Sequence, residues 1–354
     1  MSYVPAAKVA QLKPCLIKLR AERTYFWCRC GRSATQPFCD GSHAGTDFQP
    51  LKYVSPSDEE VLLCACKRTG SPPFCDGAHT NLPGGSPLDD PESVANRAVR
   101  MVRRDGPRTT LNGACCVLSP ALSAMAVRGS LRFCYLVSPE LGAQHQTQLF
   151  MATRGESSPP LTFGDRHVIL YIGAGSGAVN ISGMSFEVKA TDGVYVRPLE
   201  SIELTAAPGD ELQVYSLASP AGEIAWPDRM PDNFDAAYPE RVARVDQAQR
   251  SATGPRYFQC LVDKRLGSTV ITQFIGHIPR SKAAPHRHLY EEALIILSGE
   301  GFMWTESCKT SVRAGDVIFL PRKQLHSLQC TSAAGMDVVG VICPGDNPRI
   351  TYYD

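Results

Sequence analysis

The feature that most constrains this chain is a spacing of metal-binding residue types that occurs twice, with an offset of 36 residues. Each copy reads Cys, one residue, Cys, eight residues, Cys, three residues and His. Three soft thiolates and one imidazole at such short spacing fit either zinc or an iron–sulfur cluster. The repeat therefore predicts two metal centres of the same design near the N-terminus. Their ligands would be Cys28, Cys30, Cys39 and His43 in the first copy, and Cys64, Cys66, Cys75 and His79 in the second.

The residues between the ligands help to choose between these metals. The stretches CRCGRSATQPFCDGSH (28–43) and CACKRTGSPPFCDGAH (64–79) resemble the CDGSH iron–sulfur family, whose members hold a [2Fe–2S] cluster with three Cys and one His. Two motifs in one short segment resemble the mitochondrial-matrix and bacterial branch of the mitoNEET-like proteins. In the second copy, Ala78 replaces the usual Ser and leaves the ligands intact. The resemblance implies two [2Fe–2S] clusters, with zinc as the alternative metal.

The resemblance also implies how the ligands divide between the two irons of each cluster. Cys28 and Cys30 would hold one iron, Cys39 and His43 would hold the other, and the second cluster would repeat this arrangement. Because a neutral imidazole replaces a thiolate, each cluster carries one less negative charge and its reduction potential rises. Protonation would release the His ligand from iron, so we expect the clusters to be acid-labile or proton-coupled.

Length and charge limit the remaining functions. A chain of 354 residues is longer than one core usually supports, so two or three domains are expected. With 36 basic and 35 acidic residues, the net charge of +1 argues against a nucleic-acid or membrane-surface protein. No apolar run approaches 20 residues, so we expect no transmembrane helix.

No signal peptide opens the chain, so we expect a reducing compartment, a cytoplasmic location and no structural disulfides. The eight cysteines outside the repeat are expected to be small buried hydrophobic residues. They are Cys15, Cys115, Cys116, Cys134, Cys260, Cys308, Cys330 and Cys343.

From about residue 110 onward the sequence predicts β-structure, because short apolar runs alternate with Gly, Pro, Asp and Ser turns. Regularly spaced short strands of this kind indicate a sandwich or barrel. A basic stretch at 92–104 predicts a short helix or a solvated connector, and a Pro-rich break at 226–239 divides the β-region into halves. The predicted strands lie at 167–172, 193–198, 211–218, 268–275, 292–297, 316–321 and 337–343.

The second half of the β-region holds another group of metal-binding residue types. His286, His288 and Glu292 read HxHxxxE, and His326 follows a Gly and a Pro further along. On a strand, His286 and His288 share one face because side chains alternate. This parity predicts that the imidazoles converge on one site.

These residues resemble both sequence motifs of the cupin superfamily, whose jelly-roll barrel binds a divalent metal through three His and one Glu. The matching motif residues include Gly299, Gly315 and Pro321. The chain departs from the pattern at Ser281 and Lys323, where Gly is common, and neither position is a ligand. The resemblance implies a mononuclear metal held by His286, His288, Glu292 and His326.

The first half of the β-region carries the cupin pattern in degraded form. Aligning Pro198 with Pro321 places Glu203 where His326 stands. His167 lies near the position of Glu292, and no HxH precedes it. We therefore predict a structural first cupin, and we interpret both His167 and the isolated His145 as packed or surface residues.

The predicted fold is mainly β, with a small N-terminal iron–sulfur domain containing two CDGSH motifs, followed by two cupin jelly-roll barrels. The expected division is a tandem cluster domain at 1–82, a linker at 83–110, a degenerate cupin at 111–225, an inter-cupin linker at 226–250 and a metal-binding cupin at 251–354.

The combination of centres suggests the chemistry. Imidazole with one carboxylate suits Fe, Mn, Ni, Cu or Zn, but one-electron carriers beside the site favour Fe(II), which activates O₂. Monooxygenation consumes two external electrons per O₂, and two [2Fe–2S] clusters can hold two. We therefore predict a non-haem iron oxygenase or oxidase of a small molecule. It would react with O₂, receive electrons from an external donor and form homo-oligomers through its cupin domains. Two alternatives are a cupin dioxygenase or isomerase independent of the clusters, and a redox- or pH-sensing or ligand-binding module without catalysis.

Overall fold

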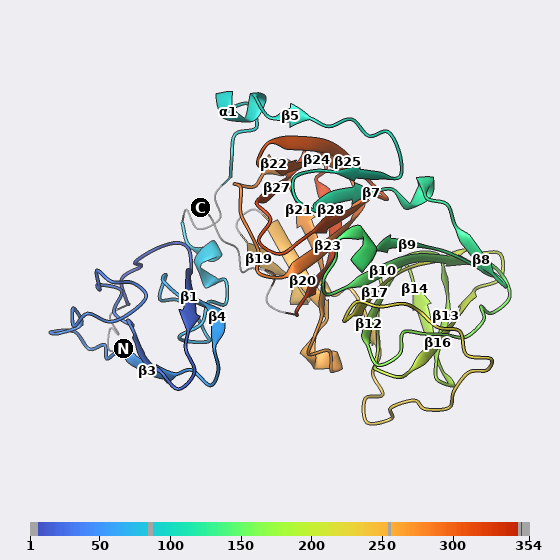
Figure 1. Ribbon diagram of the computed structural model, residues 1–354, viewed down its shortest axis with the longest axis horizontal. Helices are drawn as coiled ribbons and strands as arrows, with labels where there is room; N and C mark the ends of the chain where they lie inside the picture. Colours follow the sequence, from blue (N-terminus) through green and yellow to red (C-terminus); the bar gives the residue numbers. More distant parts are fainter. Residues whose placement is uncertain (1–5, 84–87, 254–255, 346–347, 349–354) are drawn as a thin grey trace.

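The computed structural model describes residues 6–83, 88–253, 256–345 and 348. Residues 84–87 of the predicted linker and residues 254–255, 346–347 and 349–354 of the predicted last domain lie outside this range. Figure 1 shows a small N-terminal unit beside two larger β-units, which we call the middle unit and the C-terminal unit.

The N-terminal unit contains two antiparallel strand pairs. Strand β1 (Cys15–Leu19) pairs with β4 (Glu59–Leu63), and β2 (Thr24–Trp27) pairs with β3 (Leu51–Val54). The 36-residue offset of the sequence relates β1 to β3 and β2 to β4, so the two pairs are equivalent. The internal repeat is therefore present in the backbone as well as in the ligand spacing.

The middle unit consists of two sheets. Its larger sheet has the order β18-β15-β12-β17-β10-β9-β8, and its smaller sheet has the order β11-β16-β13-β14. The larger sheet comprises β8 (Ala126–Arg128), β9 (Leu131–Val137), β10 (Thr147–Thr153), β12 (His167–Ala174), β15 (Gly193–Val196), β17 (Leu212–Ser219) and β18 (Val242–Ala243). The smaller sheet comprises β11 (Leu161–Thr162), β13 (Ser176–Ile181), β14 (Met184–Lys189) and β16 (Ser201–Ala206).

The C-terminal unit repeats this plan, with the orders β19-β20-β21-β28-β23-β26-β7-β6 and β22-β27-β24-β25-β5. The larger sheet comprises β6 (Arg108–Thr110), β7 (Cys116–Leu118), β19 (Ser251–Thr253), β20 (Arg256–Val262), β21 (Thr272–Ile278), β23 (Glu291–Ser298), β26 (Val317–Leu320) and β28 (Met336–Cys343). The smaller sheet comprises β5 (Arg100–Met101), β22 (Ser281–Lys282), β24 (Glu300–Thr305), β25 (Cys308–Arg313) and β27 (His326–Cys330).

Short helical turns connect the strands. They are α1 (Val94–Arg97), η1 (Ala78–Asn81), η2 (Pro120–Leu122), η3 (Pro139–Leu141), η4 (Gln247–Gln249) and η5 (Lys264–Leu266). Within the described part of the chain, none of these helices has the length and apolar character needed to cross a membrane.

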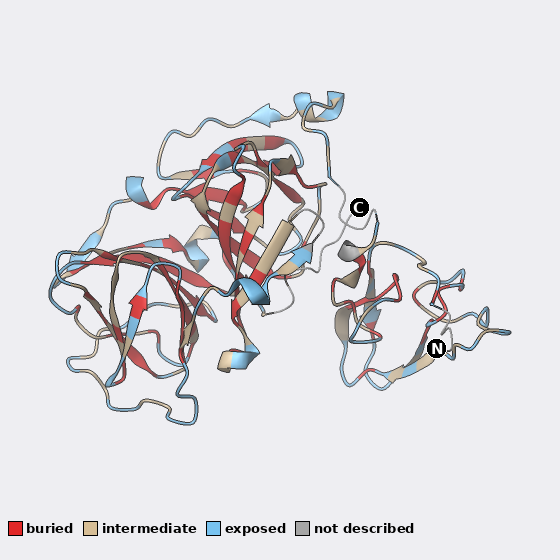
Figure 2. Ribbon diagram, turned by 180° about the vertical axis from the view of Figure 1, so that it is seen from behind, coloured by how far each residue is buried: buried red, intermediate tan, exposed pale blue. Residues whose placement is uncertain are grey.

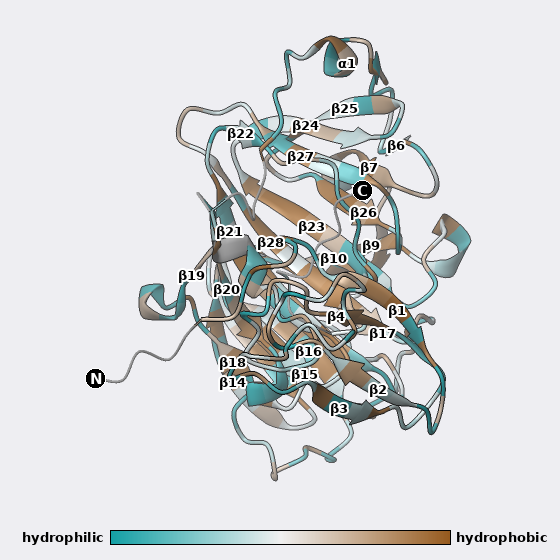
Figure 3. Cartoon of the chain, turned by 90° about the vertical axis from the view of Figure 1, so that its left-hand side faces the viewer, coloured by the Kyte–Doolittle hydropathy of each residue, from teal (hydrophilic) through white to brown (hydrophobic). Residues whose placement is uncertain are grey.

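Alternation along the strands separates three cores. On β23, Leu294 and Ile296 face the interior of the C-terminal unit, whereas Ile295 packs toward the middle unit. On β12, Leu170 faces its own interior and Tyr171 packs in the shared core between the two larger sheets. Figure 2 shows buried residues concentrated on the strands of the two larger units, and Figure 3 shows hydrophobic residues along strands such as β23 and β26. Glu292 shares the even-numbered face of β23, so its side chain points into the C-terminal unit.

A strand is present at each predicted place, although the one predicted at 268–275 begins only at Thr272, and the chain is mainly β. The helix predicted at 92–104 is limited to one turn, α1, because β5 then pairs with β25. β6 and β7 likewise extend the larger sheet of the C-terminal unit, where β7 pairs with β26. Part of the predicted linker at 83–110 is therefore integrated into a sheet. The closure of each unit into a separate jelly-roll barrel, and the domain boundaries, stay predictions.

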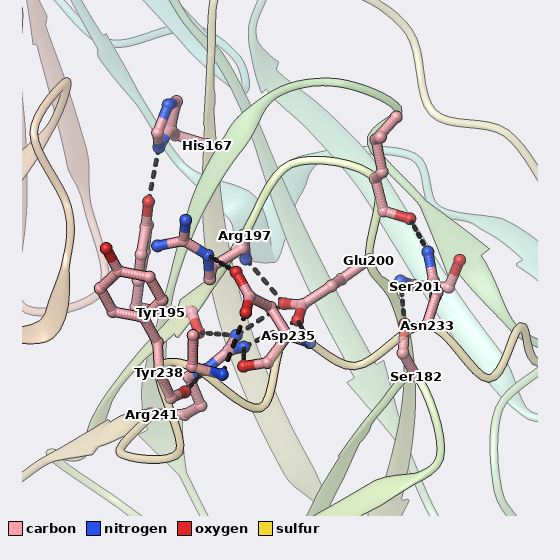
Figure 4. Close-up of polar contacts among 12 residues, drawn as sticks. His167, Ser182, Tyr195, Arg197, Glu200, Ser201, Asn233, Asp235, Tyr238 and Arg241 are labelled. Carbon is pink, nitrogen blue, oxygen red and sulfur yellow. Dashed lines mark hydrogen bonds and ion pairs between the residues drawn. The ribbon is translucent and has the colours of Figure 1, made fainter.

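A buried ion pair holds the Pro-rich segment between the two larger units (Figure 4). The guanidinium of Arg241 donates to both carboxylate oxygens of Glu200, at 2.6 and 2.7 Å. The same carboxylate accepts hydrogen bonds from the backbone N–H groups of Arg197 and Asp235. The Arg197 side chain in turn pairs with Asp235 and lies over the ring of Tyr238. The predicted inter-cupin linker is thus fastened to the middle unit.

Replacing Glu200 with Gln is expected to lower the free energy of unfolding by about 3 kcal/mol, because Arg241 would keep its charge in a buried site without a counter-ion. Chemical denaturation measures this effect. Glu187→Gln, on the exposed strand β14, is the matched control and should change stability by less than about 0.5 kcal/mol. Equal effects of the two variants would contradict a stabilising role for the pair.

Candidate cluster and metal sites

The two Cys/His sets of the N-terminal unit have the same geometry. The Sγ atoms of Cys28 and Cys30 lie 3.6 Å apart, and those of Cys64 and Cys66 lie 3.5 Å apart. Two thiolates bound to one tetrahedral metal at 2.3 Å stand roughly 3.8 Å apart, so both pairs have the spacing of ligands to a single ion. In each set the sulfur of the third Cys lies close to Nδ1 of the His. The distance is 3.2 Å from Cys39 Sγ to His43 Nδ1, and 3.5 Å between the equivalent atoms of the second set.

Backbone N–H groups point at the ligand sulfurs. Gly31 N–H donates to Cys28 Sγ at 3.3 Å, and Gly41 N–H donates to Cys39 Sγ at 3.4 Å. In the second set, hydrogen bonds from the Cys66 thiol and from nearby backbone N–H groups lower the pKa of Cys64 to about 6, although burial opposes this change. Such donors stabilise thiolates and tune cluster potentials, so the residues fit an iron–sulfur centre.

The same backbone scaffold holds the ligand loops in both copies. Cys28 N–H bonds to Pro37 O, and Cys64 N–H bonds to Pro73 O. The Asp carboxylate of each CDG segment accepts hydrogen bonds from two backbone N–H groups of its loop. For Asp40 these donors are Ala34 and Ser42. The equivalent contacts in the second copy come from residues 70 and 78.

The two sets differ in exposure. His79 is buried at 1% exposure and Cys75 at 7%, whereas His43 and Cys39 are partly exposed. Burial lowers the pKa of His79 to about 4. Water therefore reaches the first site more readily than the second, which faces the C-terminal unit.

The four residues of the predicted mononuclear site converge in the C-terminal unit. The ligand nitrogens of His286, His288 and His326 all lie within 4.8 Å of one another, and Glu292 Oε2 lies 3.5 Å from His288 Nε2. Ligands about 2.1 Å from one ion stand roughly 3–4 Å apart, so a small contraction would complete a coordination sphere. The backbone brings His286 and His326 together, because each donates its N–H to the other's carbonyl.

Carbonyl groups orient two of the imidazoles. His286 Nδ1 lies 2.8 Å from Ala284 O, and His326 Nδ1 lies 2.9 Å from Gln324 O. A carbonyl only accepts, so Nδ1 carries the proton and Nε2 is left free to bind a metal. Burial lowers the pKa of His326 to about 4 and that of His286 well below its usual range, so both are neutral at pH 7. Burial also raises the pKa of Glu292 to about 8.

The donor set and the buried carboxyl group fit a divalent cation. Three neutral imidazoles and one carboxylate are ligands for Fe, Mn, Ni, Cu or Zn. A buried carboxyl group with no cationic partner strongly favours its neutral form, and a bound cation would supply the missing charge.

Strand register shows what replaces these ligands in the middle unit. Ile202 pairs with Leu161 and Ile181 exactly as His326 pairs with His286 and Thr305, so Ile202, and not the predicted Glu203, occupies the position of His326. The equivalents of His286, Glu292 and His326 are Leu161, Val168 and Ile202, all at most 1% exposed. Gly164 corresponds to His288, because its carbonyl accepts from Leu199 N–H as the carbonyl of His288 accepts from Lys323 N–H, and it offers no side-chain ligand.

The corresponding site of the middle unit is therefore filled with hydrocarbon and has no ligands. His167 is displaced by one residue from the position of Glu292, and its Nδ1 contacts Tyr195 Oη at 2.5 Å. The sequence misplaced these positions because it relied on Pro198, which is one residue out of register with Pro321.

Three residues around the sites were not singled out as functional by the sequence. Lys67 lies between the two Cys/His sets, where it donates to Cys64 O at 3.0 Å. Leu289 packs against Leu62 and Cys75 of the N-terminal unit. Lys323, noted only as a departure from Gly, has a positive φ of 65° and forms an ion pair with Glu60 at 3.1 Å. The substitution of Lys323 for the usual Gly thus coincides with a contact between two units. The roles of Lys67 and Leu289 depend on tertiary contacts, which residue spacing in the sequence does not reveal.

All fourteen cysteines lie in the described part of the chain, and none of them forms a disulfide there. Six of the eight outside the repeat are buried, as predicted, whereas Cys15 and Cys260 are only partly buried.

Two family models match the chain. The model described as "Iron-binding zinc finger CDGSH type" matches residues 10–44, and the model described as "Cupin domain" matches residues 277–342. The chain thus contains a CDGSH-type iron–sulfur domain and a cupin domain. Among curated proteins, it is 54% identical over 52 residues to the human mitochondrial CDGSH iron–sulfur domain-containing protein 3, and the match covers 14% of this chain and 41% of that protein. The mouse counterpart is 55% identical over 47 residues, 13% of this chain and 34% of that protein.

Solved structures support the cupin fold. The chain is similar to protein Ylba from E. coli, with a TM-score of 0.51, 17% identity and coverage of 68% of this chain and 95% of that one. It is also similar to oxalate decarboxylase from Lactobacillus farciminis, with a TM-score of 0.52, 12% identity and coverage of 65% and 86%. It is similar as well to a salicylate 1,2-dioxygenase variant from Pseudoaminobacter salicylatoxidans in complex with gentisate. The TM-score is 0.52 and the identity 12%, and the match covers 68% of this chain and 84% of that one. At these identities the similarity concerns the fold.

Metal binding at the cupin site is expected to strengthen with pH. Because the pKa of Glu292 is about 8 and the imidazoles of His286 and His326 are neutral, a cation must displace a proton from Glu292 at pH 7. The affinity for Mn²⁺ should rise up to tenfold per unit between pH 6 and 8 and level off above pH 8. Calorimetry in buffers of different ionisation enthalpy measures the released proton. Glu292→Gln should abolish this dependence, and an unchanged slope in that variant would contradict the assignment.

Proposed function

We propose that this chain is a non-haem iron oxygenase or oxidase of a small molecule, in which the iron–sulfur domain supplies electrons to the cupin site. The proposal includes a [2Fe–2S] cluster at each Cys/His set, an Fe(II) ion at His286, His288, Glu292 and His326, O₂ as co-substrate and an external electron donor. When bound, the clusters would supply single electrons and the ferrous ion would activate O₂.

The observation that carries this proposal is the contact between the second Cys/His set and the cupin domain. Leu289 of the cupin domain packs against Leu62 and Cys75. Leu289 directly follows His288 in the chain. The residue next to a cupin ligand therefore contacts Cys75, a predicted cluster ligand. The buried second set is thus the nearer one along this contact, and the more exposed first set is left to receive electrons from a donor.

A polar contact reinforces the same junction. Lys323 pairs with Glu60 through its side chain, and its backbone N–H donates to His288 O at 2.8 Å. The ion pair is partly exposed and contributes little free energy, but it orients the iron–sulfur domain against the loop that carries His288. Two neighbouring residues of this loop, Leu289 and His288, therefore link the second Cys/His set to the cupin ligands.

The residues of the cupin site have distinct tasks in the proposed reaction. His286 and His326 present Nε2 because carbonyl groups hold their Nδ1 protons. Glu292 supplies the negative charge that a divalent cation requires, and the surrounding apolar core excludes water.

The test follows cluster oxidation after mixing with O₂. Anaerobically reduced protein is mixed with oxygenated buffer, with gentisate as a probe small molecule, and the visible spectrum is recorded for wild type and Glu292→Ala. We expect reoxidation to be at least tenfold faster in the wild type, because only that protein retains the cupin metal. Leu289→Ala should slow reoxidation without loss of metal, whereas Leu122→Ala, at an exposed position, should have no effect.

Other outcomes favour the other functions. Equal reoxidation in wild type and Glu292→Ala would contradict electron delivery. Turnover of the probe by a cluster-free variant without reductant would indicate a cupin dioxygenase that works independently of the clusters.

A further inference from the structure

Lys67 is a buried cation placed between the two Cys/His sets. It is 8% exposed, and its Nζ donates to Cys64 O at 3.0 Å. The same Nζ lies 4.6 Å from the centre of the Trp27 ring, and Trp27 Nε1 donates to the same carbonyl at 2.8 Å. Trp27 directly precedes Cys28, so these contacts join the first ligand of one set to the first ligand of the other.

The buried charge of Lys67 lies at the start of both Cys/His sets, against Cys64 O and the Trp27 ring. No carboxylate in this part of the chain forms an ion pair with it, although burying an uncompensated ammonium group is costly. The ammonium group contacts the Cys64 carbonyl of the second set and the ring of Trp27, which precedes Cys28 of the first set. Thiolates bound in the two sets would place negative charge on both sides of it.

The repeat explains why one lysine serves both sets. Gly31 holds the position in the first copy that Lys67 holds in the second, and both have a left-handed backbone, with φ of 75° and 62°. A Cβ added at Gly31 would lie 1.8 Å from Lys8 O and 3.3 Å from Lys67 Cγ. A side chain is therefore excluded from the first copy, and the stem of Lys67 packs beside the empty position.

From this placement we propose that Lys67 is a shared electrostatic positioning residue, whose ammonium group raises the reduction potentials of both iron–sulfur centres together. The inference rests on the two-cluster part of the proposed function and is independent of electron delivery to the cupin domain. Adding an electron makes a cluster more negative, and a nearby positive charge in a poorly hydrated site stabilises that state.

The test measures both potentials by EPR-monitored redox titration of the full-length, cluster-loaded protein. Lys67→Met should shift each one-electron reduction equilibrium toward the oxidised form by about tenfold, or ~59 mV. Lys67→Arg should retain most of the wild-type values. The matched control is Lys52→Met, which removes the same charge from an exposed position on β3 and should leave both potentials nearly unchanged. The shift in Lys67→Met should also persist in high salt, because a buried charge is weakly screened.

Iron content separates the outcomes. Both potentials falling in Lys67→Met, with iron retained, supports the proposal; a shift at only one cluster, or at neither, overturns it. If Lys67→Met and Lys67→Gln both lose the two clusters while Lys67→Arg keeps them, the positive charge is required at both sites, which also supports it. Loss from Lys67→Arg as well would assign Lys67 to packing and overturn the inference. A wild-type protein with one cluster would instead refute the two-cluster assignment before any variant is compared.

Discussion

Replacing His326 with Ala is expected to lower the metal affinity of the cupin site by more than a hundredfold and to abolish any activity that depends on it. The ligand nitrogens of His286, His288 and His326 converge within 4.8 Å, so loss of one removes a quarter of a four-ligand set. Removal of an outer-shell partner alone typically costs about ten- to a hundredfold in affinity, and loss of a direct ligand should exceed this range. Metal analysis of protein dialysed against limiting Mn²⁺ measures the effect.

The matched control is His277→Ala on β21 of the same unit. His277 pairs with Asp337 and stacks on Tyr257, away from the three converging imidazoles. This variant should retain its metal, and the visible spectrum of the N-terminal clusters should be unchanged in both variants because the units have separate cores. Full metal occupancy in His326→Ala would place the site elsewhere.

The second large effect concerns cluster content. The His326→Ala protein is expected to contain about four irons and about four acid-labile sulfides per chain, from two [2Fe–2S] centres in the N-terminal unit. This background removes the mononuclear metal from the count. Adding Cys75→Ser, which replaces a thiolate of the second set by a poorer ligand, should reduce both numbers to about two.

Cys15→Ser is the control for this experiment, because Cys15 is a partly buried cysteine in the same unit that belongs to neither set. It should leave the iron and sulfide contents unchanged. Tightly bound zinc without visible absorption in anaerobically prepared protein would instead identify both sets as zinc sites. A count of about two irons both before and after Cys75→Ser would show that the second set holds no cluster.

Local spacing was sufficient to predict the ligand sets. Cys28, Cys30, Cys39 and His43 lie within sixteen residues, so short loops alone bring them together, and the repeat shows the same design at 64–79. Alternation along a strand likewise predicted that His286 and His288 share a face. Helix length at 92–104 was predicted less well, because pairing of β5 with β25 is a contact between segments some 200 residues apart.

The sequence by itself determined the residue types and spacings of the candidate metal sites, because those depend on chemistry and on short stretches of backbone. Only the tertiary structure decided the register that puts Ile202 opposite Leu161, the packing of Leu289 on Cys75 and the position of Lys67 between two Cys/His sets. These features depend on contacts between distant segments, where a shift of one residue exchanges the two faces of a strand. A hydrophobic pattern alone is compatible with either neighbouring register.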